Sequence, residues 1–268
     1  MKTVGVVGWP IGHSRSPAIF AHWFERYGVS ARYELIPVPP KEADAFFAAL
    51  PAQWDGVNVT IPHKETAARH VVLEGAGARL GVANTLWRDG DLVRGTSSDG
   101  EGFVKSLDAA HPPWRDAAGP AVVLGAGGAA VAIVDALIAE GRTVMVANRT
   151  AARAEAIAET AGVTAVPMEA LGDALASAGL FVNTTALGMA GRPSMNIDLA
   201  PLSATATVAD IVYNPLETQL LAAARGRGLA TVDGLGMLLY QATLGFERWF
   251  GIAPEVDDEL RARVVATL

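Results

Sequence analysis

The sequence contains no cysteine, and this absence excludes several kinds of chemistry together. Disulfide bridges, thiolate metal sites and a cysteine nucleophile all require the thiol, and no other metal site is predicted. No stretch approaches the roughly 18 uncharged apolar residues that a membrane span requires. Residues 1–8 form a short apolar run without the long apolar region and cleavage site of a signal peptide. These absences favour a cytoplasmic protein that does not enter a membrane.

Positive charge is in deficit as well, with 21 Lys and Arg against 28 Asp and Glu and a formal net charge of −7. Binding to a nucleic-acid backbone requires a basic face, so a nucleic-acid partner is not expected. The net charge does not limit a local pocket, because a few donors suffice to hold a small anion. A small-molecule substrate is therefore the expected partner.

The sequence does have a regular alternation of strand and helix patterns, and its 51% of hydrophobic residues suffices for a packed core. We predict strands at residues 4–7, 32–36, 57–60, 84–87, 92–94, 121–124, 143–147, 163–166, 180–183, 207–211 and 229–232. We predict helices at 17–27, 41–50, 129–140, 151–161, 237–249 and 254–267, and a further helix opened by Pro62. Residues 88–91 carry a hairpin signal. Such alternation indicates βαβ units and largely parallel sheets.

The clearest interruption is His111-Pro112-Pro113-Trp114, after which the strand and helix pattern restarts. A chain of 268 residues can hold one large domain or two small ones. We predict an α/β fold of two α/β domains with a cleft between them, the second a Rossmann-type dinucleotide-binding domain. Ligands of such sheets bind beyond the carboxyl ends of the strands.

A glycine-rich turn follows the strand at 121–124 and contains Gly125, Ala126, Gly127, Gly128 and Ala129. Glycines permit a tight turn and a close approach of the backbone to a pyrophosphate, which the following helix N-terminus attracts. The alternative is an ordinary turn between strand and helix. The strand–turn–helix context favours a dinucleotide site.

The end of the next strand indicates which dinucleotide binds. Asn148 lies 20 residues past Gly128, where an NAD enzyme places a carboxylate to bind the ribose 2′-OH. This sequence has Asn148-Arg149-Thr150 instead, and a guanidinium can bind a 2′-phosphate that a carboxylate would repel. Arg153 adds a second positive charge one helical turn later. NADP is therefore predicted over NAD, the alternative being that both arginines are solvated surface charges.

Polar clusters in the first half are candidates for substrate contacts. Ser14 and Ser16 precede a helix and can donate to a carboxylate, although Ser16 could also be only an N-cap. Asn58 and Thr60 share a strand face because side chains alternate with period two. Lys64 falls in the first turn of a helix, where its charge opposes the helix dipole. A solvated surface lysine is the alternative.

Two further polar positions complete these candidates. Asn84 begins a predicted strand, and Asp99 lies in a glycine-containing loop where it could also be only a cap or turn residue.

Taken together, the motifs resemble the shikimate dehydrogenase family over nearly the whole chain. The matching stretches are residues 8–17, 58–64, 83–86, 99–102, 125–130, 148–150, 183–189, 210–218 and 236–241.

The resemblance implies an NADP-dependent oxidoreductase that reversibly reduces 3-dehydroshikimate to shikimate, in the route to chorismate and the aromatic amino acids. It implies a substrate-binding and catalytic domain at residues 1–102 plus 237–268, and an NADP-binding Rossmann domain at 103–236. Members of the family are monomers or homodimers. The expected acid/base pair is Lys64 and Asp99, because an ammonium can stabilise and protonate the oxygen that gains charge on hydride delivery.

The resemblance also implies the remaining site residues. The expected substrate contacts are Ser14, Ser16, Asn58, Thr60, Asn84, Tyr213 and Gln241. The expected NADP contacts are Gly125, Ala126, Gly127, Gly128, Ala129, Asn148, Arg149, Thr150, Arg153, Thr184, Gly234 and Met237.

The chain departs from the usual family pattern where Ser97 and Ser98, rather than Asn-Thr, precede Asp99. The nearest alternative is a quinate/shikimate dehydrogenase or another shikimate dehydrogenase-like paralogue. A non-catalytic NADP-binding sensor on the same fold would be expected to lack the Lys64 and Asp99 pair. A methylene-tetrahydrofolate dehydrogenase-like enzyme would be expected to lack the two-serine motif.

Overall fold

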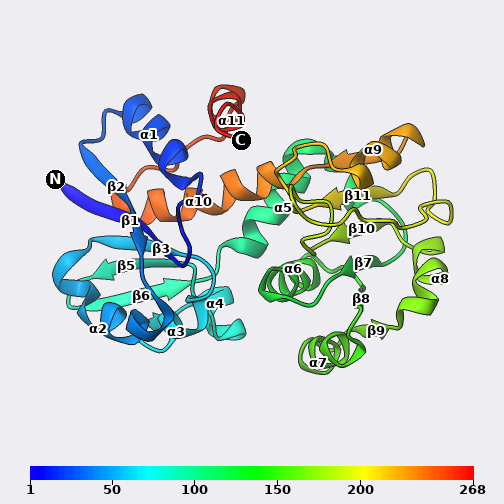
Figure 1. Cartoon of the computed structure of the whole chain (residues 1–268), viewed down its shortest axis with the longest axis horizontal. Helices are drawn as coiled ribbons and strands as arrows, with labels where there is room; N and C mark the ends of the chain where they lie inside the picture. The colour runs from blue at the N-terminus through cyan, green and yellow to red at the C-terminus, as the bar shows by residue number, and fades with distance from the viewer. The chain divides into compact units, whose positions relative to one another are not determined.

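Each half of the chain builds a six-stranded sheet that helices cover, as the computed structural model shows (Figure 1). The structure describes residues 1–50 and 53–268 in full, and of residues 51–52 only the helical backbone. The first unit contains residues 1–98 and 239–268, and the second contains residues 99–238. The predicted α/β class is confirmed in both units. Among the described residues, no helix is long and apolar enough to cross a membrane.

The sheet of the first unit is mixed. Its strands are β1 (Lys2–Gly8), β2 (Ala31–Pro37), β3 (Gly56–Val59), β4 (Val72–Leu73), β5 (Thr85–Asp89) and β6 (Leu92–Thr96). They lie in the order β2-β1-β3-β5-β6-β4, and β5 is antiparallel to both β3 and β6. The predicted hairpin is confirmed: Asp89 pairs with Leu92, and Gly90 takes the positive φ of 60° that the tight turn requires.

The helices of this unit are α1 (Ser16–Tyr27), α2 (Ala43–Gln53), α3 (Lys64–Ala68), α4 (Gly75–Leu80), the part of α10 (Gly234–Phe250) from Leu239 onward, and α11 (Asp258–Val265). The prediction that Pro62 opens a helix is wrong. His63 donates its backbone N–H to the Thr60 carbonyl at 3.0 Å and its side chain bonds the Val38 carbonyl at 2.7 Å. Residues 60–63 therefore form a turn, and α3 begins after it.

The two faces of this sheet bury different kinds of side chain. One face packs aliphatic residues of β1, β3 and β5 against Phe47 and Leu50 of α2. The other carries an aromatic cluster from α1 and α10, in which Phe20 stacks on Tyr33 with ring centroids 4.0 Å apart. Trp249 lies so close to Gly56 that a Cβ there would be 2.0 Å from its Nε1. The absence of a side chain at Gly56 therefore lets Trp249 of α10 pack closely on the sheet.

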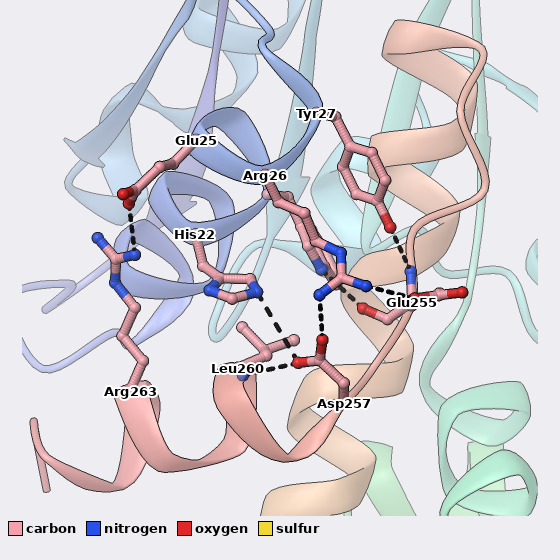
Figure 2. Close-up of polar contacts among 9 residues, drawn as sticks. His22, Glu25, Arg26, Tyr27, Glu255, Asp257, Leu260 and Arg263 are labelled. Atoms are coloured by element: carbon pink, nitrogen blue, oxygen red, sulfur yellow. Dashed lines mark hydrogen bonds and ion pairs between the residues drawn. The ribbon is translucent and has the colours of Figure 1, made fainter.

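Helix α11 is attached to α1 by polar contacts (Figure 2). Arg26 of α1 pairs with Asp257 and bonds Glu255 at 2.6 Å, while Arg263 of α11 bonds Glu25 at 2.7 Å. The buried His22 has its Nε2 3.8 Å from Asp257. These contacts fix the C-terminal segment on the first unit.

The sheet of the second unit is entirely parallel. Its strands are β7 (Ala121–Leu124), β8 (Val144–Ala147), β9 (Thr164–Val166), β10 (Leu180–Asn183), β11 (Thr207–Asp210) and β12 (Ala230–Val232). They lie in the order β12-β11-β10-β7-β8-β9, which is the doubly wound order of dinucleotide-binding sheets. The topological switch point lies between β7 and β10, so a ligand is expected at the carboxyl ends of these strands.

Helices cover both faces of this sheet. They are α5 (Asp99–Ala110), α6 (Gly128–Ala139), α7 (Ala151–Ala161), α8 (Leu171–Ala176) and α9 (Gln219–Gly226), joined by the first part of α10. Side chains of β7 alternate between faces: Ala121 and Val123 pack with α5, α6 and α7, whereas Val122 and Leu124 pack with α8 and α9 (Figure 1). Both faces are buried, as expected for a parallel sheet.

Candidate active site

Polar residues from three strands lie together at one end of the first unit's sheet. The end of β3, the start of β5 and the end of β6 meet there because β5 runs antiparallel to its neighbours. The Val59 N–H donates to the Asn84 carbonyl at 2.7 Å, and the Asn84 N–H donates to the Thr96 carbonyl at 3.0 Å. Of the predicted substrate residues, Asn58 therefore lies on β3, and Asn84 directly precedes the adjacent strand β5.

Asn58 is buried, and its amide is oriented by neighbours on both sides. The Tyr33 hydroxyl donates to Asn58 Oδ1 at 2.8 Å, and Asn58 Nδ2 donates to Thr85 Oγ1 at 3.3 Å. Burial raises the pKa of Tyr33 far above its ordinary range, and a hydrogen bond with the Ser16 hydroxyl opposes that shift. Tyr33 is therefore a neutral donor at any working pH. Its hydroxyl lies between two residues expected to bind substrate, Asn58 and Ser16.

Asn84 is held in the same way by Ser98. The Ser98 backbone N–H donates to Asn84 Oδ1 at 2.8 Å, and the Ser98 hydroxyl donates to the Gln241 carbonyl at 2.8 Å. Thr85 Oγ1 also donates to Asn84 Oδ1, at 3.1 Å. One hydrogen-bonded network thus joins the side chains of Asn58 and Asn84 through Thr85, and Ser98 links it to the main-chain carbonyl of Gln241. The predictions missed these two hydroxyls, although both lie beside residues that the motifs identified.

Ser14, Ser16 and Lys64 lie at the starts of helices. Helix α1 begins at Ser16, and its N-cap, Arg15, makes no side-chain capping bond, so Ser16 is not an N-cap. Ser14 Oγ accepts the Ser16 N–H at 3.3 Å, and Ser16 is buried. Lys64 is the partly exposed first residue of α3, as predicted, and its carbonyl accepts the Ala83 N–H at 3.1 Å. The chain leading into Asn84 is thereby tied to Lys64.

The other half of the expected acid/base pair and one expected substrate residue lie in the second unit. Asp99 is the buried first residue of α5, directly after Ser98 in the chain. Tyr213 is partly exposed and follows β11. Lys64 and Asp99 therefore belong to different units.

The glycine-rich turn lies at the switch point of the second sheet. Gly125 follows β7 with φ 121°, and a Cβ there would be 2.2 Å from Thr184 Oγ1, just beyond β10. Gly127 is the N-cap of α6, and both Gly127 and Gly128 are exposed, with open space where a Cβ would stand. A phosphate can therefore approach this backbone closely. Ala126 and Ala129 flank these glycines and are half-buried.

A pocket of about 330 Å³ opens beyond the carboxyl ends of β7, β8 and β10. Its lining includes Asn148 and Arg149, two residues predicted to bind the cofactor. It also includes Leu124, Met168, Thr185, Leu187 and Ile197, which were not among the predicted contacts, although Thr185 and Leu187 lie in the matching stretch 183–189. Thr184, which the predictions placed at the cofactor, is buried and donates its hydroxyl to the Leu124 carbonyl at 2.8 Å.

The arginines at this pocket differ from most others in the chain. Arg94 and Arg115 each pair with two carboxylates, whereas no hydrogen bond or ion pair of the described residues involves the guanidinium of Arg149 or Arg153. Both side chains are exposed, and α7 begins directly after Thr150, whose carbonyl accepts Asn148 Nδ2 at 2.9 Å. Arg149 therefore lines the pocket, and Arg153 lies about one helical turn after Arg149 in the chain.

Gly234 and Met237 lie on the first turn of α10. A Cβ at Gly234 would be 2.2 Å from the Ile211 carbonyl oxygen, so only glycine lets α10 approach the segment after β11 this closely. Met237 packs against the core that includes α5 and α6.

A doubly wound parallel sheet, a glycine turn at its switch point and a pocket lined by Arg149 beside it define a dinucleotide-binding protein. Residues 6–86 match the shikimate dehydrogenase substrate binding domain, residues 115–191 match shikimate / quinate 5-dehydrogenase, and residues 234–258 match the shikimate 5'-dehydrogenase C-terminal domain. The chain therefore belongs to the shikimate dehydrogenase family, and it is an NADP-dependent enzyme of that family.

Individual proteins agree with this assignment. The shikimate dehydrogenase (NADP(+)) of Rhodopseudomonas palustris (strain BisB5) is 50% identical over 98% of this chain and 94% of its own length. The shikimate 5-dehydrogenase of Thermus thermophilus, solved with NADP(H) and shikimate, is 34% identical with a TM-score of 0.90, covering 100% of both chains. The quinate dehydrogenase of Corynebacterium glutamicum, solved with NAD, is 29% identical with a TM-score of 0.89, covering 99% of both chains.

Proposed function

We propose that this chain reversibly reduces the ring carbonyl of 3-dehydroshikimate to the hydroxyl of shikimate, with NADPH as the hydride donor. The observation that carries the proposal is the buried network of Asn58, Thr85, Asn84 and Ser98 in the first unit, which Ser98 links to the main chain of Gln241. A polyhydroxylated ring needs several oriented donors and acceptors, and a network of fixed amides supplies them. The names of the relatives agree with this substrate.

In this proposal the first unit binds the substrate. Ser14 and Ser16 hold its carboxylate, because two hydroxyls and the N-terminus of α1 supply donors without a buried cation. Asn58, Thr60, Asn84 and Gln241 bind the ring hydroxyls, and Tyr213 contributes from the second unit. Catalysis follows from orientation, because a ring fixed by these groups presents one carbonyl to the cofactor.

Lys64 and Asp99 perform the proton chemistry. NADPH supplies the hydride, and the carbonyl oxygen becomes negative as the hydride arrives at its carbon. The Lys64 ammonium stabilises that oxygen and gives it a proton, while Asp99 orients the ammonium and exchanges the proton. In the reverse direction the same pair removes the hydroxyl proton of shikimate.

The second unit binds NADP. The pyrophosphate lies on the turn from Gly125 to Gly128, where the α6 N-terminus offers N–H groups. Arg149 binds the 2′-phosphate, with Arg153 as a second charge, because neither guanidinium is occupied by a carboxylate of the described chain. Thr185 and Leu187 form another part of the pocket wall.

Replacement of the proposed acid tests the reaction. The wild-type protein should oxidise shikimate with NADP, followed by the absorbance of NADPH. Lys64→Ala should lower kcat by roughly 10²- to 10⁴-fold, the usual contribution of a positioned acid or base, with a much smaller change in KM for shikimate.

Lys105→Ala is the matched control, because Lys105 is an exposed lysine of α5 that pairs with Glu101 and should leave the rate unchanged. An unchanged kcat in Lys64→Ala would show that Lys64 is a surface residue with no part in proton transfer.

A further inference from the structure

A buried carboxylate at the end of β11 has no assigned part in the reaction. Asp210 is 2% exposed, and no cation among the described residues pairs with it. It accepts three hydrogen bonds from neutral donors: Asn183 Nδ2 at 2.8 Å, the Val212 N–H at 3.0 Å and the Thr218 hydroxyl at 2.7 Å. The three donors come from the end of β10, from the segment after β11 and from the N-cap of α9.

The bond from Asn183 fixes that side chain in one orientation. Because Nδ2 is turned to Asp210, Oδ1 is turned the other way and accepts both the backbone N–H and the hydroxyl of Thr185, at 2.9 Å and 2.8 Å. The Thr185 hydroxyl in turn accepts the Leu187 N–H at 3.1 Å. Asn183 is fully buried, so it acts only through its neighbours.

Thr185 and Leu187 are the residues that this chain of bonds reaches, and both line the pocket beside Arg149. Backbone bonds hold Thr184 and residues 188–190 of this loop, whereas the N–H groups of Thr185 and Leu187 donate only to side chains. Burial raises the pKa of Asp210, while its bonds with Thr218, Val212 and Asn183 oppose that shift. The three hydrogen bonds therefore offset the cost of removing the Asp210 carboxylate from water. Its Oδ1 accepts two of them and its Oδ2 accepts the third.

We propose that Asp210 is a positioning residue for the cofactor: it orients Asn183, which holds the Thr185–Leu187 wall of the NADP pocket in shape. The inference rests on the proposed function only in taking NADP as the occupant of this pocket. It extends that function to a residue that touches neither substrate nor cofactor.

Asp210→Asn tests the proposal, because the amide keeps the size of the carboxylate but offers one acceptor oxygen in place of two. Its NH₂ must face either the Asn183 NH₂, which cannot accept a hydrogen bond, or the Thr218 hydroxyl, which must then turn its hydrogen away and lose its present acceptor. The dissociation constant of NADPH, measured by fluorescence titration without substrate, should rise about tenfold, which corresponds to about 1.4 kcal/mol. The titration needs no turnover, so failure of the proposed reaction would leave this test intact.

Asp108→Asn is the matched control. Asp108 lies in the same unit and accepts hydrogen bonds from Trp114 Nε1 at 2.9 Å and from Arg115, but it does not line the pocket. This variant should lower the melting temperature and leave the NADPH dissociation constant unchanged. A merely structural role for Asp210 predicts the same result for Asp210→Asn, and that result would overturn the proposal.

A double variant with Asp210→Asn and Asn183→Asp makes the test independent of whether the single variant folds. The exchange restores the bond between positions 183 and 210 with donor and acceptor reversed, and the carboxylate placed at position 183 can still accept from Thr185. The NADPH dissociation constant should return to within about threefold of the wild-type value, since coupled neighbours compensate one another. A folded double variant that still binds NADPH about tenfold more weakly than wild type would also overturn the proposal.

Discussion

At the scale of single residues, the proposed role of Arg149 in the choice of cofactor can be measured directly. Arg149→Ala should raise KM for NADP by roughly 10- to 100-fold, because a hydrogen bond between charged groups contributes about 1.5–3 kcal/mol. KM for NAD should stay the same, since NAD has no 2′-phosphate. Steady-state kinetics with both cofactors measures the difference.

The matched control is Arg225→Ala, since Arg225 is an exposed arginine of the same unit that pairs with Glu217. It should change neither KM. Equal losses for NADP and NAD in Arg149→Ala would mean that Arg149 shapes the pocket without contacting the 2′-phosphate.

The Tyr33 hydroxyl is the second group whose effect can be measured. Tyr33→Phe removes the donor to Asn58 Oδ1 and leaves the ring stacked on Phe20. KM for shikimate should rise roughly fivefold, in line with about 1 kcal/mol for one buried hydrogen bond, while KM for NADP is unchanged.

Tyr27→Phe provides the comparison, because its hydroxyl in the same aromatic cluster accepts the Glu255 N–H instead (Figure 2). It should leave both constants as they are. If Tyr33→Phe behaves in the same way, Thr85 and the strand orient Asn58 without the Tyr33 hydroxyl.

Sequence patterns indicate candidate site residues where a motif is local, but not where a contact spans the chain. Arg149 could be predicted because its distance from Gly128 along the chain has a known meaning. The sequence could not show that Thr184 is buried while Thr185 lines the pocket. The reason is that the Thr184 hydroxyl donates to the carbonyl of Leu124, which is 60 residues away. Tyr33 carried no signal at all, since its partner Asn58 is 25 residues distant.

At the scale of elements, periodic apolar segments were predicted closely and short polar ones were missed. Helix α7 (Ala151–Ala161) and strand β10 (Leu180–Asn183) have the predicted bounds. Helix α4 was missed because Gly75 and Gly77 lower its helix propensity, and Gly77 is required where a Cβ would be 2.7 Å from Thr96 Cα. Helix α5 was missed for a similar reason, since it opens with Asp99-Gly100-Glu101-Gly102.

The attachment of α11 to α1 predicts a pH dependence of stability. A hydrogen bond from the Leu260 N–H and the nearby Arg26 hold the pKa of Asp257 below its ordinary value, against the opposing effect of burial (Figure 2). A lowered pKa in the folded state means that the ionised carboxylate stabilises the fold. This contribution is fully present above the ordinary pKa of about 3.9 and is lost as the pH falls through the lower folded value.

Asp257→Asn should therefore lower the melting temperature at neutral pH, and the difference from wild type should disappear in acid. The neutral-pH loss should be small, about 1 kcal/mol or less, because Asn can still cap α11 and the ion pair is partly exposed. Glu159→Gln, which removes an exposed carboxylate of α7, is the control. A difference that is independent of pH would exclude ionisation of Asp257 as its cause.

At the scale of the whole molecule, the two units divide the proposed tasks. The first presents a network of amides and hydroxyls that suits a polyhydroxylated acid, and the second presents a glycine turn and unpaired arginines that suit a phosphorylated dinucleotide. Substrate specificity and cofactor specificity are therefore separable. Variants of Asn58 or Asn84 should alter substrate specificity, and variants of Arg149 should alter cofactor specificity.

The most direct measurement is a comparison of kcat/KM for shikimate and quinate, each with NADP and with NAD, on the purified wild-type chain. The highest value is expected for shikimate with NADP, because Arg149 can bind a 2′-phosphate and quinate carries an additional hydroxyl near Ser14 and Ser16. A higher value for quinate with NAD would assign the chain to the quinate branch of the family. No turnover of shikimate with either cofactor would contradict the proposed function outright.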